Sequence, residues 1–356
     1  MSEVWHARSK AHPADFLMLA PGAIDLHTHI LPERWPDLRE RYGCGGWVSM
    51  EHCGQCRARM LIDGALFREV ESNLWDPRRR ISECDRDAVG VQVLSTVPVM
   101  FSYAARAEHA HDLAQLLNDH LADVVRGNRT RFVGLGSVPL QDAALATREL
   151  ERCVRDLGLA GVQIGTNVAG RDLDDSATAP FFAAAEELGA AVFVHPWEMF
   201  GRAEIPRFWM PWLVGMPAES ARAFCALAFG GVLDRHPRLR ICFAHGGGAF
   251  PYTLGRIEHG YSVRPDLCAT HSPTPPREHL RRLFFDSIVH DMCALRYLVD
   301  TVGASRIALG SDYPFPLGEI PPGRLLRSAE WLTDAQRARM LRGTALEFLG
   351  LSQVNA

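Results

Sequence analysis

The amino-acid sequence predicts an α/β fold, a parallel (β/α)8 TIM barrel with a small insertion after its first strand. Short apolar runs typical of buried strands alternate with helical patterns along the chain, and this alternation is typical of a parallel sheet with crossover helices. Eight such units favour closure into a barrel. The competing architecture is an open doubly wound sheet, but its G-x-G-x-x-G motif does not follow the first strand.

The elements are expected in a regular order. The first strand is predicted at 23–27, and the segment 32–76, dense in Pro, Gly and aromatic residues, is predicted to be an insertion of short strands and turns. Further strands are predicted at 91–95, 132–136, 162–164, 190–194, 240–244, 283–286 and 307–311. Helices are predicted near 77–88, 106–126, 142–156, 178–188, 218–235, 249–260, 291–302, 322–331 and 334–348, with loops at 196–217 and 265–276.

The chain of 356 residues is expected to form one barrel domain, because α/β barrels reach this length as single domains. The predicted division is an N-terminal extension at 1–22, a barrel at 23–351 that includes the insertion, and a C-terminal tail at 352–356. We find no internal repeat and no low-complexity segment.

The composition limits the classes of function. With 47% hydrophobic and 22% charged residues, the chain is typical of a soluble globular protein. A net charge of -4 without a basic cluster argues against a nucleic-acid partner. No apolar run reaches the roughly 20 residues that a membrane span needs. The arginines at 78–80 are interpreted as a solvated helix start.

Cysteine usage suggests the compartment. The nine cysteines are scattered and odd in number, and the first 22 residues lack a convincing signal-peptide core. We therefore expect reduced thiols and a cytoplasmic protein. The lone pair Cys53 and Cys56 is interpreted as an ordinary loop pair rather than a zinc site, because no second pair accompanies it.

The strongest candidate for chemistry is the pair His27 and His29 at the end of the first strand. Residues two apart on a strand point to the same side, so both imidazoles are expected to face one point. A catalytic zinc site usually needs about three protein ligands, so further ligands must come from elsewhere. His195, His245 and Asp312 each end another apolar run, and the C-terminal strand ends of a barrel gather on one face.

Each of these residues also has a less specific interpretation. A single histidine at a strand end is more often structural, but five candidates at four strand ends are hard to explain that way. His109 and His111 also form a His-x-His pair, but they lie in a helical pattern, where residues two apart diverge, and are expected at the surface. The run of three glycines after His245 resembles an oxyanion loop, but the chain has no G-x-S-x-G elbow, which disfavours a serine hydrolase.

Longer strings then resemble a known family. The segments 25–29 (DLHTH), 193–197 (FVHPW), 242–248 (CFAHGGG) and 309–318 (LGSDYPFPLG) are similar to those of the metal-dependent hydrolases of the amidohydrolase superfamily. The segments 31–38, 95–101, 161–165 and 211–219 resemble, more narrowly, its zinc-dependent decarboxylase branch. The resemblance extends from about residue 24 to about 351.

The resemblance implies roles for particular residues. His27, His29, His195 and Asp312 would bind one Zn²⁺ per subunit, with no organic cofactor, and His245 together with Asp312 would serve catalysis. By residue type alone, the remaining candidates are ordinary surface or packing residues. By resemblance, Arg256 would reach the active site of the partner in a homodimer, and the substrate contacts would be Arg68, Arg256, Trp212, Phe315 and Met199.

The resemblance also implies a reaction. It is the non-oxidative decarboxylation of a small dicarboxylate, 2-amino-3-carboxymuconate-6-semialdehyde, in the kynurenine branch of tryptophan catabolism, which diverts material from quinolinate. The alternatives are another decarboxylase or hydrolase of the same superfamily that acts on an aromatic acid or a lactone, and a non-catalytic metal-binding protein. The N-terminal extension and Glu198, where related sequences usually have Asp, depart from the family pattern.

Overall fold

In the computed structural model, which describes residues 19–351, eight parallel strands form a near-closed barrel, as predicted. In chain order and also in spatial order, they are β1 (Ala23–Ile30), β5 (Val89–Thr96), β6 (Phe132–Ser137), β7 (Gly161–Ile164), β8 (Ala191–Val194), β9 (Arg240–Phe243), β10 (Phe284–Asp286) and β11 (Ile307–Ala308). Nearly every residue of these strands is buried, because helices cover the outside and side chains fill the inside. Residues 1–18 of the predicted extension and the predicted tail lie outside the described residues.

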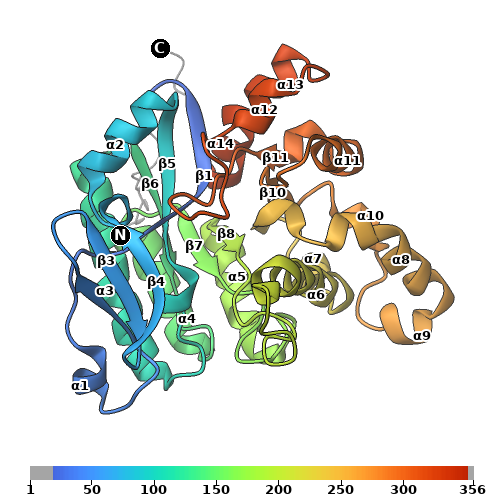
Figure 1. Ribbon diagram of the computed structural model, residues 1–356. Helices are drawn as coiled ribbons and strands as arrows, with labels where there is room; N and C mark the ends of the chain where they lie inside the picture. The colour runs from blue at the N-terminus through green and yellow to red at the C-terminus, as the bar shows by residue number, and fades with distance from the viewer. Residues whose placement is uncertain (1–18, 352–356) are drawn as a thin grey trace, which may run out of the picture.

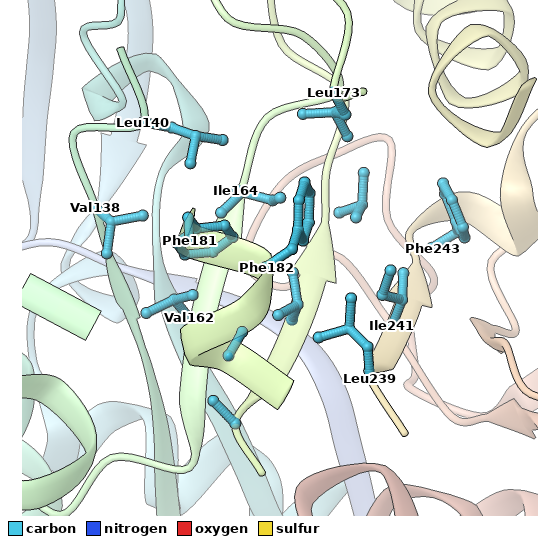
Figure 2. Packing of buried hydrophobic residues seen from close by; sticks show 14 of the residues in the cluster. Val138, Leu140, Val162, Ile164, Leu173, Phe181, Phe182, Leu239, Ile241 and Phe243 are labelled. Atoms are coloured by element: carbon cyan, nitrogen blue, oxygen red, sulfur yellow. The ribbon is translucent and has the colours of Figure 1, made fainter. Parts of the chain in front are cut away.

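Helices connect the strands and pack around them (Figure 1). They are α2 (Pro77–Arg86), α3 (Ala107–Gly127), α4 (Ala143–Glu151), α5 (Ala179–Leu188), α6 (Met216–Phe229), α7 (Val232–Arg235), α8 (Phe250–Val263), α9 (Pro265–Cys268), α10 (Pro276–His279), α11 (Met292–Val302), α12 (Arg324–Ser328), α13 (Asp334–Ala338) and α14 (Thr344–Leu349). In Figure 2, Phe181 and Phe182 of α5 lie among side chains of β7 and β9, such as Val162 and Ile241. This packing joins the strands to the outer helices in one hydrophobic core.

The insertion after β1 forms a separate small sheet, which Figure 1 shows in blue at the left of the molecule. It contains α1 (Leu38–Tyr42) and the antiparallel strands β2 (Val48–His52), β3 (Arg57–Ile62) and β4 (Ala65–Glu71). The expectation of short strands and turns at 32–76 is met, apart from the short helix α1. The sheet shares a hydrophobic cluster with Phe315, a residue that follows β11, so the insertion lies against the C-terminal ends of the barrel strands.

The barrel closes between its first and last strands without a regular ladder. β11 is only two residues long, whereas the sequence predicted a strand at 307–311. Main-chain bonds join the edges instead: Leu26 N donates to Leu309 O at 2.8 Å, and Asp312 N donates to His27 O at 2.9 Å. Just beyond the strand, Gly310 packs so closely that a Cβ atom would lie 2.8 Å from Asp286 Cβ and 2.9 Å from His27 Cβ, so glycine is needed there, and the chain then turns at Asp312, whose φ is 58°.

Three other details differ from the prediction. The helix expected at 218–235 is divided into α6 and α7, because the chain turns at Gly231 with a φ of 72°. The loop expected at 265–276 contains α9. The interpretation of 78–80 as solvated is wrong for Arg80, which is 0% exposed. Within residues 19–351, no helix has the length and apolar character that crossing a membrane requires.

Candidate metal centre and active site

Three imidazoles meet at the C-terminal end of the barrel with the same ring atom free. His27 Nδ1 lies 2.6 Å from Asp286 Oδ2, His29 Nδ1 lies 2.9 Å from Thr96 O, and His195 Nδ1 lies 3.0 Å from Pro196 O. These oxygens accept hydrogen bonds, so each Nδ1 carries the proton and each Nε2 keeps its lone pair. The sequence rule that residues two apart share a face thus holds for His27 and His29.

The free nitrogens point at one another and at a carboxylate. His27 Nε2 lies 3.1 Å from His29 Nε2, and Asp312 Oδ1 lies 3.1 Å from His29 Nε2 and 3.4 Å from His27 Nε2. His195 Nε2 is buried and has no hydrogen-bond partner among the described residues. Lone pairs that face one another repel, and a buried unpaired nitrogen is costly. A cation between these atoms removes both penalties, so the residues present fit a divalent metal ion.

Electrostatics keep the candidate ligands in their binding-competent forms. Burial lowers the pKa of His29 and holds the pKa of His195 well below its usual range, which favours neutral imidazoles. Burial alone would raise the pKa of Asp312, but the nearby His245 and His29 imidazoles outweigh burial and hold this pKa well below its usual range. The centre therefore offers neutral nitrogens and an ionised carboxylate at neutral pH.

His245 lies at the edge of the same cluster. Its Nε2 is 3.9 Å from Asp312 Oδ2, and its ring centroid is 5.0 Å from that of His195. Burial lowers the pKa of His245, but the Asp312 and Asp286 carboxylates outweigh burial and raise it. A histidine whose pKa is raised near a metal site can accept a proton at neutral pH and return it.

By distance alone, His245 could also complete a ligand set, since one atom each from His27, His195, His245 and Asp312 lie within 4.8 Å of one another. This set omits His29. We favour His29 as the ligand, because its Nε2 approaches Asp312 at 3.1 Å, whereas His245 approaches at 3.9 Å. His245 is also the more exposed of the two, with 18% of its side chain accessible against 0% for His29, which leaves it free to act on a substrate.

Asp286 holds two parts of the centre together, and the sequence did not single it out. Its Oδ2 accepts from His27 Nδ1 and, at 2.8 Å, from His245 N. Its Oδ1 accepts from Gly246 N at 2.8 Å and from Ile288 N at 3.1 Å. Gly246 adopts a φ of 59° at this turn, where glycine is favoured. The sequence did contain one signal that could have identified it, since Asp286 ends a predicted strand as the other candidates do.

A cavity of about 340 Å³ opens beside the cluster. Besides His29, His195, His245 and Asp312, it is lined by Arg68 from β4, by Phe315, and by Trp197, Trp209, Trp212 and His290. Of these, Trp197, Trp209 and His290 were not among the predicted site residues. The Arg68 guanidinium lies 4.3 Å from the Phe315 ring centroid and pairs with no carboxylate among the described residues. Burial lowers the pKa of Arg68, while the charge of Asp312 opposes that effect.

Two predicted substrate contacts lie elsewhere. Met199 is buried against Gly215 and is not among the described residues that line the cavity. Arg256 lies exposed on α8, away from the cavity of its own chain. The structure therefore brings Arg68, Trp212 and Phe315 to the candidate metal centre, but not Met199 or Arg256.

Comparison with known proteins shows the family. The family model described as amidohydrolase matches residues 24–351. The chain belongs to the amidohydrolase family. Among curated relatives, the 2-amino-3-carboxymuconate-6-semialdehyde decarboxylase of Dictyostelium discoideum is 56% identical over 92% of this chain and 91% of its own length.

Two solved structures share the fold of this chain. The 5-carboxyvanillate decarboxylase of Sphingomonas paucimobilis is 29% identical, covers 79% of this chain and 85% of its own, and has a TM-score of 0.72. A dihydroxybenzoic acid decarboxylase from Polaromonas, solved with manganese and an inhibitor, has a TM-score of 0.75 at 23% identity and covers 94% of this chain and 98% of its own. The Dictyostelium and Sphingomonas relatives confirm the predicted enzyme class, a carboxy-lyase, and both solved structures confirm the barrel fold.

Proposed function

We propose that the protein is a zinc-dependent decarboxylase of 2-amino-3-carboxymuconate-6-semialdehyde. The observation that carries the proposal is Arg68, an arginine without a carboxylate partner in residues 19–351, in the same cavity as the candidate metal centre. A largely buried guanidinium without a carboxylate partner suits a substrate that brings its own carboxylate. The relative from Dictyostelium, which carries this substrate in its name, supports the choice.

The proposed reaction removes one carboxylate from the substrate. The bond from carbon 3 to its carboxylate breaks, carbon dioxide leaves, the electron pair stays on the carbon, and a proton takes the vacated position. The carboxylate is vinylic, so the bond resists breaking until the conjugated enamine is disrupted. A divalent cation bound at the centre supplies a Lewis acid that stabilises negative charge on oxygen. No organic cofactor or oxidant enters this balance.

The protein's own residues would position the substrate and move the proton. Arg68 would bind a carboxylate, and Phe315 with Trp212 would enclose the conjugated chain and exclude water. His245 would take up one proton from solvent and deliver it to the carbon that loses the carboxylate, which supplies the one proton that the reaction consumes, and its raised pKa suits both steps. His27, His29, His195 and Asp312 would hold zinc, because three nitrogens and one carboxylate suit this ion.

We propose that the enzyme acts as a homodimer in which Arg256 enters the partner's cavity. Arg256 is exposed and forms no ion pair within residues 19–351. Tyr252, one helical turn earlier, is 84% exposed, and its ring lies 6.4 Å from that of Tyr297 on α11. Arginine and tyrosine are enriched at protein interfaces. Arg256 would supply the second cation that a dicarboxylate needs.

A mixing experiment tests the shared site. Arg256→Ala protomers are combined with inactive His245→Ala protomers, and heterodimers are isolated. One site in each heterodimer then contains a native His245 and receives a native Arg256, so activity should return to about half of the wild-type value. Heterodimers as inactive as either parent would contradict the shared site.

We place the reaction in the cytoplasm, within the kynurenine branch of tryptophan breakdown. All nine cysteines are free, which suits a reducing compartment. An aromatic-acid decarboxylase is the second candidate function, because several aromatic side chains line the cavity and the Sphingomonas relative is a 5-carboxyvanillate decarboxylase.

A comparison of substrates distinguishes the two candidate functions. Zinc-loaded and manganese-loaded protein are each added to freshly generated 2-amino-3-carboxymuconate-6-semialdehyde, and absorbance loss is compared with spontaneous cyclisation to quinolinate. We expect faster decay and less quinolinate, with a kcat/KM at least about 100-fold above that for dihydroxybenzoate, whose single carboxylate leaves one arginine without a partner, since a buried polar group that loses its partner costs several kcal/mol. Decay at the spontaneous rate by metal-loaded protein would refute the substrate assignment.

A further inference from the structure

Arg80 on α2 is a fully buried cation that neither the sequence nor the proposed reaction explains. Its side chain is 0% exposed, and it makes no direct bond to a carboxylate among the described residues. Burying an arginine in this way is costly. Its neighbours in sequence differ: Arg78 is exposed, and Arg79 pairs with Glu71 and Glu83.

The hydrogen bonds of Arg80 lead to the metal centre. Its Nη1 donates to the main-chain oxygen of His29 at 2.6 Å and to Asn73 O at 2.9 Å, and its Nε donates to Gln92 Oε1 at 3.1 Å. Arg80 thus holds the end of β1 from behind, at the residue whose imidazole faces the centre. Its Nη2 is buried without a hydrogen-bond partner in the described part of the chain.

The same guanidinium also contacts the segment that carries the carboxylate ligand. It lies 4.7 Å from the ring centroid of Tyr313, the residue after Asp312. A cation over an aromatic face is stabilising, more so when both are desolvated. Arg80 therefore contacts both edges of the barrel seam, by which we mean the junction between β1 and the segment after β11. On one edge it bonds the main chain of His29, a candidate ligand, and on the other it contacts Tyr313, the neighbour of the candidate ligand Asp312.

The barrel seam is irregular, so a contact such as that of Arg80 is needed to hold its two edges together. β11 ends at Ala308, and beyond it Asp312 adopts a φ of 58°, which is unusual for a residue other than glycine. A few main-chain bonds cross the seam there, among them His29 N to Tyr313 O at 2.8 Å. A strained ligand beside an irregular seam keeps its position only if its surroundings hold it.

We propose that Arg80 is a positioning residue that fixes the spacing between His29 and Asp312 and thereby sets the affinity of the centre for its metal ion. Only arginine offers both several donors in a plane and a flat face for stacking. A lysine at this place keeps the charge but can direct fewer bonds and stacks poorly. The proposal does not depend on which substrate the enzyme uses.

The test measures metal affinity and folding separately. Zinc affinity of Arg80→Lys and Arg80→Met is determined by competition with a chromophoric chelator, and urea unfolding is followed on the metal-free proteins. We expect zinc affinity to fall about 10- to 100-fold, as for other groups that orient metal ligands. Arg78→Met is the matched control from the same helix turn and should bind zinc as the wild type does. Wild-type zinc affinity in a destabilised Arg80 variant would overturn the proposal.

A second pair of variants keeps the proposal testable if the Arg80 variants do not fold. Tyr313→Leu removes the ring that Arg80 contacts, whereas Tyr313→Phe keeps the ring and removes only the hydroxyl bond to Glu83. We expect Tyr313→Leu to lower zinc affinity several-fold and Tyr313→Phe to leave it close to the wild-type value. Equal zinc affinities in the two variants would contradict a role for the Arg80–Tyr313 contact.

Discussion

Asp286→Asn should weaken metal binding without touching a candidate ligand. The carboxylate accepts four hydrogen bonds, two on each oxygen, from His27 Nδ1, His245 N, Gly246 N and Ile288 N. An asparagine has one carbonyl oxygen, and its amide nitrogen donates. In either orientation of the amide, its nitrogen faces two groups that also donate.

The orientation of the amide decides which of these bonds is lost. If the amide nitrogen faces His27, the imidazole must move its proton to Nε2, the atom that faces the centre, and the ligand is lost. If it faces Gly246 and Ile288, two hydrogen bonds to a charged group are lost, each contributing about 1.5–3 kcal/mol. Changes in groups that orient metal ligands typically cost 10–100-fold in affinity, or about 1.4–2.8 kcal/mol. We expect Asp286→Asn to fall in this range.

The assay is chelator competition for zinc, with urea unfolding of the metal-free protein alongside it. Asp291→Asn is the matched control, because Asp291 accepts from Cys293 N and Ala294 N at the start of α11, and asparagine caps a helix as well as aspartate does. The control should keep both zinc affinity and stability. A folded Asp286→Asn protein that binds zinc as tightly as the wild type would refute the reasoning.

Two further predictions concern charge. Arg68→Met should lower kcat/KM about 10–100-fold, through a higher KM, because one charge-assisted hydrogen bond to substrate is lost. Steady-state kinetics measure this effect, with Arg78→Met as the control variant. An unchanged KM in Arg68→Met would count against the prediction. Burial raises the pKa of Glu83, but hydrogen bonds from Tyr313 and Arg79 outweigh it and bring the pKa below its ordinary value of 4.5. The ionised form of Glu83 therefore stabilises the fold above about pH 4.5, and this contribution fades as the pH falls through the lower folded pKa. Urea unfolding of Glu83→Gln should show a larger loss of stability near pH 7 than near pH 3, and equal losses at both would be inconsistent with the lowered pKa.

The sequence predicted the elements whose signals are local. Strands of buried apolar residues alternate with amphipathic helices, so their order and number follow from periodicity. The residues at the strand ends follow from barrel geometry, which is why His27, His195, His245 and Asp312 meet although they span most of the chain. The family assignment rested on longer strings, and the comparisons confirm it.

The parts that could not be predicted depend on contacts between distant segments. Arg80 looked like one of three solvated arginines, and its burial depends on hydrogen bonds to His29 O and Gln92 Oε1 and on the approach of Tyr313, more than 200 residues later. β11 is shorter than its apolar run, and beyond it the chain turns at Asp312, whose φ of 58° no apolar pattern predicts. The predicted role of Arg256 depends on a second copy of the chain.

The most direct test of the central claim is to count carbon dioxide released per molecule of 2-amino-3-carboxymuconate-6-semialdehyde consumed, in wild-type protein and in His245→Ala protein of equal metal content. The proposed reaction requires one carbon dioxide per substrate in the wild type. In His245→Ala, the release rate should fall at least about 100-fold, the usual contribution of a general acid–base residue. Carbon dioxide release at the wild-type rate from metal-loaded His245→Ala protein would contradict it.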